Sequence, residues 1–193
     1  MPAYPPCIKN VDTETDDIKS LKLSVTYSVG GRSDQRYVSA NGYFKSPVLF
    51  SREDPVRIAF VCPEKKSILV DIVPGSRLHD VLTELDCKII AASPFPEKTR
   101  PFLLTDKAGN PQLRLKCAFA KAWKNKDKKM ISKTEALSGD NSTLSFWRIE
   151  MYRFQRAYNG TWSVMWALHG AVVEPAEAEE KQQSDDESWI DEM

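Results

Sequence analysis

Cationic side chains and aromatic rings alternate along the second half of this 193-residue sequence, a pattern suited to binding a polyanion. Between Lys98 and Lys133 there are eleven cationic residues and two acidic ones, a formal net charge of +9. Cations attract phosphates, and rings stack on unpaired bases. The pattern therefore predicts a surface for single-stranded nucleic acid, with contacts from Arg114, Lys116, Lys121, Trp123, Lys124, Lys126, Lys128, Lys129, Tyr152, Arg153, Phe154 and Arg156.

Two other interpretations of these residues remain open. The stretch WKNKDKKMISK, taken by itself, is typical of a solvated loop. Trp123, Tyr152 and Phe154 can either contact bases or pack in the core, because a ring serves both purposes. Three further rings are assigned to core packing, and these are Phe146, Trp162 and Trp166.

The C-terminal segment, from Glu174 to Met193, carries the opposite charge. Nine carboxylates against Lys181 alone give a formal net charge of −8, so the rest of the chain carries about +8. With little to bury, this segment is expected to be disordered and to compete with phosphates for a cationic groove. Its apolar tip predicts a docking site for a partner protein, the alternative being a solubility tail with an incidental Trp. The predicted docking residues are Asp185, Asp186, Glu187, Trp189, Ile190, Asp191, Glu192 and Met193.

Catalysis is not indicated by the residue types that usually perform it. His79 and His169 have no Ser, Cys or carboxylate partner at a recognisable spacing. The sequence holds neither a phosphate-binding glycine loop nor an HExxH motif. We therefore expect no enzyme activity and no cofactor.

The cysteine pattern and the hydropathy favour a cytoplasmic protein without a metal. The four cysteines lie 55, 25 and 30 positions apart, without a CxxC pair, which favours reduced thiols over a metal site. No apolar run approaches the roughly 20 residues of a membrane span, and the polar, Pro-rich start differs from a signal peptide.

Apolar periodicity predicts a mainly β fold with one short helix. In the helix, Leu78, Val81, Leu82 and Leu85 fall at i, i+3, i+4 and i+7, and Ser76 is placed to cap the N-terminus. Asn159-Gly160 predicts a hairpin turn between the last two strands. Strands are predicted at 21–29, 36–50 (broken at Gly42), 56–62, 67–73, 112–120, 143–155 and 161–173, with an irregular loop at 92–112.

Short strands around a single helix suit a small barrel, and an OB-like five-stranded barrel is the predicted fold. The predicted regions are an N-terminal arm with an extra strand (1–30), an OB-like DNA-binding domain (31–173) and a disordered acidic tail (174–193).

Three stretches, in their order along the chain, resemble the replicative single-stranded-DNA-binding proteins of podovirus-type bacteriophages. VRIAFVCP followed by LHDVLTEL resembles the strand that leads to the single helix of that family. PFLLTDKAGNPQLRLKCAFA resembles its turn and its strand of alternating cations that ends at a Cys. Tyr152-Arg153-Phe154, before a turn at Gly160 and a strand to Val173-Glu174, is similar to its Tyr, basic, aromatic triplet.

This resemblance implies non-sequence-specific binding of single-stranded DNA in phage DNA replication and recombination, with protection and annealing of strands. It implies a homodimer in the host bacterial cytoplasm, with DNA polymerase and helicase recruited through the tail. It assigns ring and phosphate contacts to Tyr152, Arg153 and Phe154, and weakly to the cations at 121–133.

The sequence departs from the family at three places. Family tails end in Phe, whereas this one ends in Met193; the loop at 124–133 is built differently; and residues 1–29 have no counterpart. Two rival functions stay open, a protein–protein adaptor whose basic face binds an acidic partner and an RNA-binding OB protein.

Overall fold

A computed structural model provides the structure of this protein. It describes residues 10–12, 18–27, 35–40, 48–51, 54–117, 122–125, 127, 129–136 and 142–174. The predicted tail from Pro175 onward, much of the predicted arm, and Lys121, Lys126 and Lys128 lie outside the described residues.

Five strands close into a barrel. They pair in the ring order β10–β5–β6–β8–β11–β10, in which β8 and β11 are parallel and the other neighbours antiparallel. This closure, with one main helix, confirms the predicted mainly β, OB-like barrel. The barrel strands are β5 (Val56–Cys62), β6 (Ser67–Asp71), β8 (Pro111–Lys116), β10 (Thr143–Arg156) and β11 (Trp162–Glu174).

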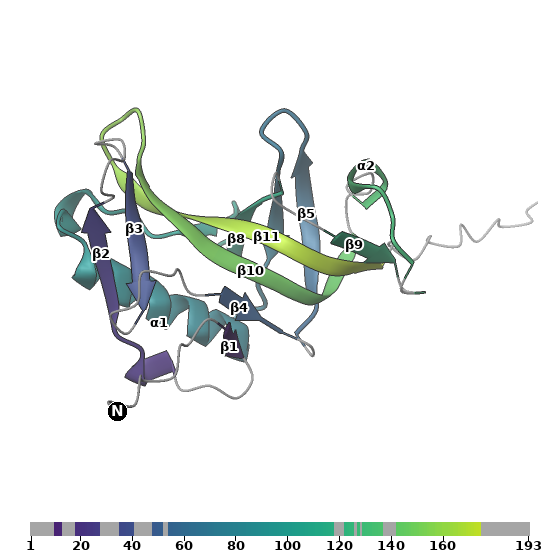
Figure 1. Ribbon diagram of the computed structural model, residues 1–193, viewed down its shortest axis with the longest axis horizontal. Helices are drawn as coiled ribbons and strands as arrows, with labels where there is room; N and C mark the ends of the chain where they lie inside the picture. The colour runs from purple at the N-terminus through teal and green to yellow at the C-terminus, as the bar shows by residue number, and fades with distance from the viewer. Residues whose placement is uncertain are drawn as a thin grey trace, which may run out of the picture.

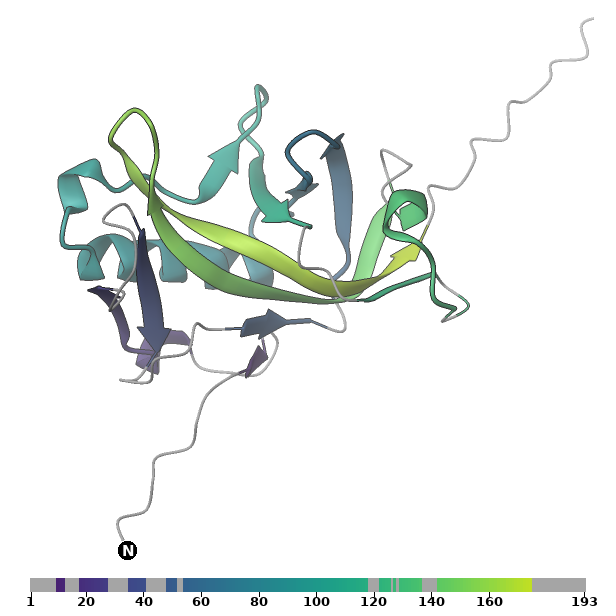
Figure 2. The same cartoon turned by 45° about the horizontal axis from the view of Figure 1, so that its top comes forward.

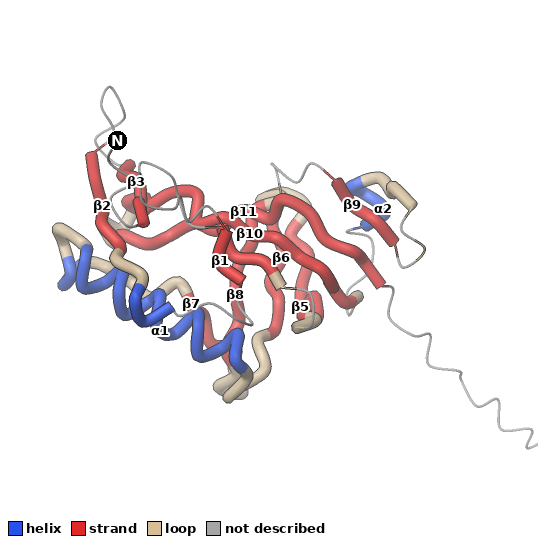
Figure 3. The backbone as a smooth tube through the Cα atoms, turned by 60° about the horizontal axis from the view of Figure 1, so that its bottom comes forward, coloured by secondary structure: helices blue, strands red, loops and turns tan. Residues whose placement is uncertain are grey.

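The helix α1 (Arg77–Ala92) begins where the sequence predicts. The Ser76 side chain accepts a hydrogen bond from the His79 backbone N–H, which satisfies one of the donors left free in the first helical turn. The stripe of Leu78, Val81, Leu82 and Leu85 is buried in the core. The helix runs along one side of the molecule, in contact with β2 (Leu23–Tyr27) and β7 (Leu103–Thr105) (Figure 3).

The β10–β11 pair spans the length of the molecule, and further elements join it at both ends (Figure 1). At the end with the turn, β2 pairs with β3 (Gln35–Ala40), and β3 pairs with β10 through Arg36 and Phe154. At the other end, β9 (Ala122–Asn125) pairs in parallel with β11, and α2 (Lys133–Ala136) packs on β9 (Figure 2).

A third addition joins the middle of β10. There β4 (Val48–Phe50) pairs with β10 and carries β1 (Asn10–Asp12) alongside it in parallel. The broken strand predicted at 36–50 is therefore two strands, β3 and β4, as its central Gly42 suggests. Through β1 and β2, described parts of the predicted N-terminal arm join the same sheet as the barrel.

The loop predicted at 92–112 contains more structure than its Pro and Gly content indicates. It holds the 3-10 turn η2 (Pro96–Lys98) and β7, which pairs with β8. A buried carboxylate explains part of this order, because Asp86 of α1 accepts hydrogen bonds from the backbone N–H groups of Phe102 and Leu103.

A second 3-10 turn, η1 (Ile18–Ser20), packs against α1. Among the described residues, no helix is both long and apolar enough to cross a membrane.

Candidate nucleic-acid interface

A β-bulge in β5 turns Phe60 to the outside of the barrel. Ile58 faces Val70 of β6, but Phe60 faces Leu69, so one residue of β5 is inserted between the two pairs. Without this bulge, Phe60 would follow Val56 and Ile58 into the core, because side chains alternate along a strand. Instead its side chain is 51% exposed.

The exposed ring lies in a row of side chains that crosses three strands. Directly opposed residues on neighbouring strands lie on the same face of a sheet. Since Phe60 opposes Leu69, and Leu69 opposes Arg114 of β8, the ring and the guanidinium are on the same outer face. Lys116 follows Arg114 by two residues in β8, so its side chain lies on the same face. Its Nζ donates a hydrogen bond to the backbone oxygen of Lys65, at 3.0 Å.

Two tight turns border this face. Residues 63–66 join β5 to β6, and Lys66 N donates to Pro63 O at 3.0 Å. Residues 157–161 join β10 to β11, and their backbone is closed by hydrogen bonds from Ala157 N and Gly160 N. The positive φ of 83° at Gly160 favours glycine, as the Asn-Gly signal predicts. Tyr158, in this turn, is fully exposed.

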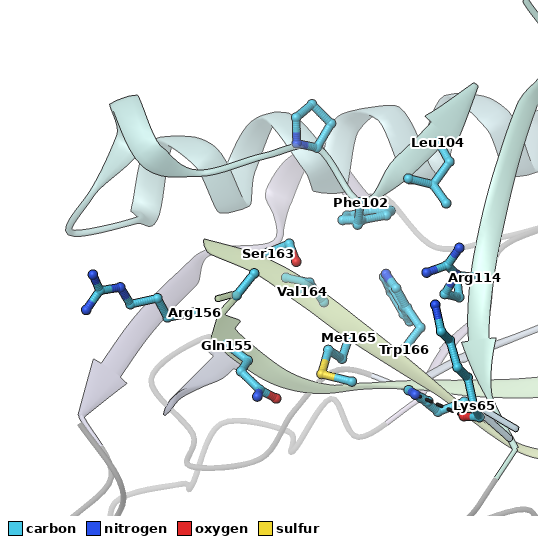
Figure 4. Close-up of a pocket in the computed structure, with 13 residues that line it drawn as sticks. Lys65, Phe102, Leu104, Arg114, Gln155, Arg156, Ser163, Val164, Met165 and Trp166 are labelled. Atoms are coloured by element: carbon cyan, nitrogen blue, oxygen red, sulfur yellow. Dashed lines mark hydrogen bonds between the residues drawn. The ribbon is translucent and has the colours of Figure 1, made fainter. Parts of the chain in front are cut away.

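A cavity of about 340 Å³ opens between these two turns (Figure 4). Its walls come from the residues around β7, from β8, and from the ends of β10 and β11 that flank the turn. None of the described residues that line it is acidic, and four are cationic: Lys65, Arg114, Lys116 and Arg156. Such a cluster of like charges produces a positive potential that favours a phosphate.

Three of the predicted contact residues meet at this cavity, namely Arg114, Lys116 and Arg156. Arg153 is half-buried and opposes Met165, next to the cavity. Lys124 and Lys129 are exposed but lie at the β9 end. Because β9 pairs with residues 170–173 of β11 and the cavity is lined by residues 163–166, about 20 Å of strand separates the two groups.

The prediction that Trp123 and Phe154 contact bases is wrong in this structure. Phe154 is 0% and Trp123 is 2% exposed, so neither ring offers a face to a ligand. Phe154 stacks on Trp162 with 5.4 Å between ring centroids, and Trp162 also stacks on Phe95 at 5.3 Å. The reason is that β10 and β11 carry strands on their outer edges, so core positions extend beyond the barrel.

The rings assigned to the core divide differently from the prediction. Trp162 and Trp166 are buried, as predicted. The assignment of Phe146 to the core is wrong, because this residue is 60% exposed. Its backbone has a φ of 47° and lies at an irregularity in the β10–β11 register. The side chain of Tyr152 lies outside the described residues, as do Lys121, Lys126, Lys128 and the predicted docking residues of the tail.

Two residues of the interface, Phe60 and Lys65, were not predicted from the sequence, whereas Tyr158 belongs to the rings that alternate with Arg153 and Arg156 near the last turn. Lys65 carried a usable signal, since OB barrels bind oligonucleotides through the loops between strands 1 and 2 and strands 4 and 5. Phe60 carried none, because its orientation depends on a bulge that the alternating pattern of VRIAFVC does not reveal.

The carboxyl of Asp86 anchors one wall of the cavity. Burial raises the pKa of this group to about 6, although the backbone hydrogen bonds from Phe102 and Leu103 act in the opposite direction. Phe102 lines the cavity, so the titration of Asp86 is coupled to one of its walls.

The two histidines have partners in the fold. His79 Nδ1 accepts a hydrogen bond from the Gly75 backbone N–H. His169 Nε2 lies 2.5 Å from Glu150 Oε2, a carboxylate brought near by the β10–β11 pairing and not recognisable from its spacing in the sequence. Neither histidine lines the cavity. The described residues hold no group of three His, Cys, Asp or Glu side chains that could bind a metal ion.

Neither a family model nor a curated protein sequence matches this chain. The functional assignment therefore depends on the residues and their geometry.

Proposed function

We propose that this protein binds single-stranded DNA without sequence specificity, along the outer face of β6 and β8 and the two turns that border it. OB barrels bind oligonucleotides through this face and these loops. The observation that carries the proposal is a cavity lined by four cationic side chains and, among the described residues, by no acidic one. The exposed rings of Phe60 and Tyr158 lie on the same face and in the adjoining turn.

The exposed rings favour single strands over duplexes. A ring stacks on a base only when the base is unpaired, and stacking is sequence-tolerant because every base has a π face. Duplex recognition commonly uses a helix that enters the major groove. The helix α1 is unsuited to that role, because its exposed face carries Arg77, Asp80, Thr83 and Cys87 and no cluster of cations.

The acidic C-terminal tail is proposed to regulate this surface and to recruit partners. Its net charge of −8 complements the cations of the cavity, so it competes with DNA for them. Displacement by DNA then presents Trp189 and Ile190 to replication proteins, with DNA polymerase and helicase as the proposed partners. A role in phage DNA replication and recombination, strand annealing and a homodimeric state complete the proposal.

The test is a titration of fluorescently labelled oligo(dT) with the full-length protein, followed by anisotropy at several salt concentrations. The logarithm of the binding constant should fall linearly with the logarithm of the salt concentration. The slope is about −0.7 for each phosphate contacted, or about −3 for four cations. A matched variant with the tail carboxylates replaced by amides should bind more tightly at low salt, because the competing charge is removed.

Other outcomes identify the rival functions. Absence of binding to oligo(dT) at low salt contradicts the proposal and favours the protein–protein adaptor. Tighter binding of oligo(rU) than of oligo(dT) contradicts the assignment to DNA and favours RNA, because the 2′-hydroxyl distinguishes the two.

A further inference from the structure

The cavity at the interface has an apolar interior and a cationic mouth. Phe102, Val164, Met165 and Trp166 form much of its lining (Figure 4). Its volume of about 340 Å³ is at the lower end of the range for pockets that enclose a small organic molecule, roughly 300–1,000 Å³. A cation-binding surface for phosphates alone has no need of such an interior.

The indole of Trp166 has an unsatisfied donor at this cavity. The residue is 1% exposed, and its Nε1 makes no hydrogen bond within the described part of the chain. Trp147, also buried, shows the usual arrangement, because its Nε1 donates to the backbone oxygen of Asp54 at 2.7 Å. More than nine in ten buried polar groups in proteins have a partner. Because Trp166 also lines the cavity, its unpaired N–H favours a ligand that supplies an acceptor there.

Two cations stand on opposite sides of the mouth. Arg156 and Arg114 extend from different strands, with the cavity between them (Figure 4). Both are exposed, and neither makes an ion pair with another described residue. Gln155 and Ser163, opposed across β10 and β11, add an amide and a hydroxyl between them.

We infer that this cavity receives one unpaired nucleobase, with the flanking phosphates on Arg114 and Arg156, an inference that rests on the proposed function. A base fits because it is flat, apolar on its faces and rich in carbonyl and ring-nitrogen acceptors, one of which takes the Trp166 N–H. Inorganic phosphate does not fit the apolar interior, and an apolar molecule leaves the N–H unpaired. The outer face stacks bases on Phe60, and the cavity holds one base of the same strand by insertion.

The test is NMR of the full-length protein labelled with ¹⁵N in its tryptophans, titrated with thymidine monophosphate. The indole N–H signal of Trp166 should shift downfield and saturate, since a new hydrogen bond deshields the proton. The internal controls are Trp147, whose N–H is already paired, and Trp123, whose Nε1 is also unpaired but lies away from the cavity. Both signals should stay in place, and inorganic phosphate at the same concentration should leave all three unchanged.

Two variants extend the test. Trp166→Phe keeps a ring but removes the donor, and should weaken thymidine monophosphate binding about 5-fold, the effect of one neutral hydrogen bond. Ser163→Leu fills the mouth, because Ser163 lines it, and should abolish the shift of the Trp166 signal while the protein remains folded.

The outcomes separate this inference from the proposed function. If oligo(dT) binds with the expected salt dependence but the Trp166 signal does not respond to thymidine monophosphate, the cavity inference is wrong and the outer face alone binds DNA. The edge-to-face contact between the rings of Trp166 and Phe102, with 5.2 Å between their centroids, is then the environment of the Trp166 indole without any ligand. If inorganic phosphate causes the same shift, the cavity is an anion site and the inference is also wrong. If thymidine monophosphate shifts the Trp166 signal but oligo(dT) does not bind, the cavity is a mononucleotide site and the proposed function fails.

Discussion

The two ends of the β10–β11 pair are both basic, but only one of them has the other features of a binding site. At the turn end, Arg156 lies beside an apolar cavity, with the exposed ring of Tyr158 in the adjoining turn. At the far end, Lys124 and Lys129 project from β9 and the segment after it, while the neighbouring ring of Trp123 is buried.

This difference shows that the density of lysines along a sequence is a weak guide to a site. Lys124 and Lys129 of the far end belong to the most basic stretch of the sequence, 121–133. The cations of the turn end come from three separate segments, at Lys65, at 114–116 and at Arg156, which the closed barrel brings together. A binding site for nucleic acid needs cations, exposed rings and a recess in one place, and tertiary structure brings these together here.

The largest predicted effect compares two phenylalanines of β10. Phe154→Ala at the turn end should lower the free energy of unfolding by about 3–5 kcal/mol, because the ring is fully buried against Trp162. Phe146→Ala at the far end should change it by less than about 0.5 kcal/mol, because this ring is 60% exposed. Urea denaturation followed by circular dichroism measures both, and equal costs would contradict the division between the two ends.

The second prediction reverses two charges at each end. Arg114→Glu with Arg156→Glu should weaken oligo(dT) binding on the order of 100-fold at low salt and reduce the salt slope by about 1.4. Lys124→Glu with Lys129→Glu is the matched control, with the same change in net charge and equally exposed positions. It should weaken binding by less than about 3-fold through the long-range field alone. Anisotropy titrations measure both, and a larger loss in the control would move the site to the far end.

The third prediction concerns the two exposed phenylalanines. Phe60→Ala should cost about 1–3 kcal/mol of binding free energy for each base that stacks on the ring, roughly 10-fold for one base. Phe146→Ala removes a ring of similar exposure at the other end and should leave the affinity unchanged. If Phe60→Leu, which keeps an apolar side chain, binds as well as the native protein, stacking is not the reason.

The last prediction concerns the pH dependence of stability set by Asp86, which leaves DNA binding aside. Its pKa is raised to about 6 by burial, so the folded state holds this proton more tightly than the unfolded chain does. The resulting stabilisation is complete below about pH 4 and is lost as the pH rises through 6, with a decline of about 2–3 kcal/mol. The asparagine of Asp86→Asn cannot ionise, so the unfolding free energy of this variant should change less with pH than that of the native protein. Urea titrations from pH 4 to 7 measure both. A parallel decline in the variant would contradict this assignment.

The local elements could be predicted because each depends on residues close together in the sequence. The apolar spacing from Leu78 to Leu85 and the Ser76 cap define the start of α1, and Asn159-Gly160 defines the last turn. Strand β5 follows from the run VRIAFVC, with the same bounds as predicted. Strand β7 was missed because it is three residues long and depends on pairing with β8 and on the Asp86 carboxylate.

The candidate site could be predicted only in part. Arg114, Lys116 and Arg156 were found because alternation in a strand places a cation on the exposed face whatever the fold around it. The same reasoning could not separate core rings from exposed rings, since an aromatic residue in a strand is equally suited to core and surface. Phe154 is buried because β3 and β11 flank it, and Phe60 is exposed because a bulge turns it outward.

The sequence by itself determined the strand content, the helix, the hairpin turn and the separation of a basic body from an acidic C-terminus, because these depend on composition and short-range spacing. Tertiary structure alone decided which rings face the solvent, which cations share a cavity, and that Trp166 meets this cavity with an unpaired N–H. The physical reason is barrel closure. It brings together residues up to about 100 positions apart, such as Lys65 and Trp166, and pairing across strands determines the direction of each side chain.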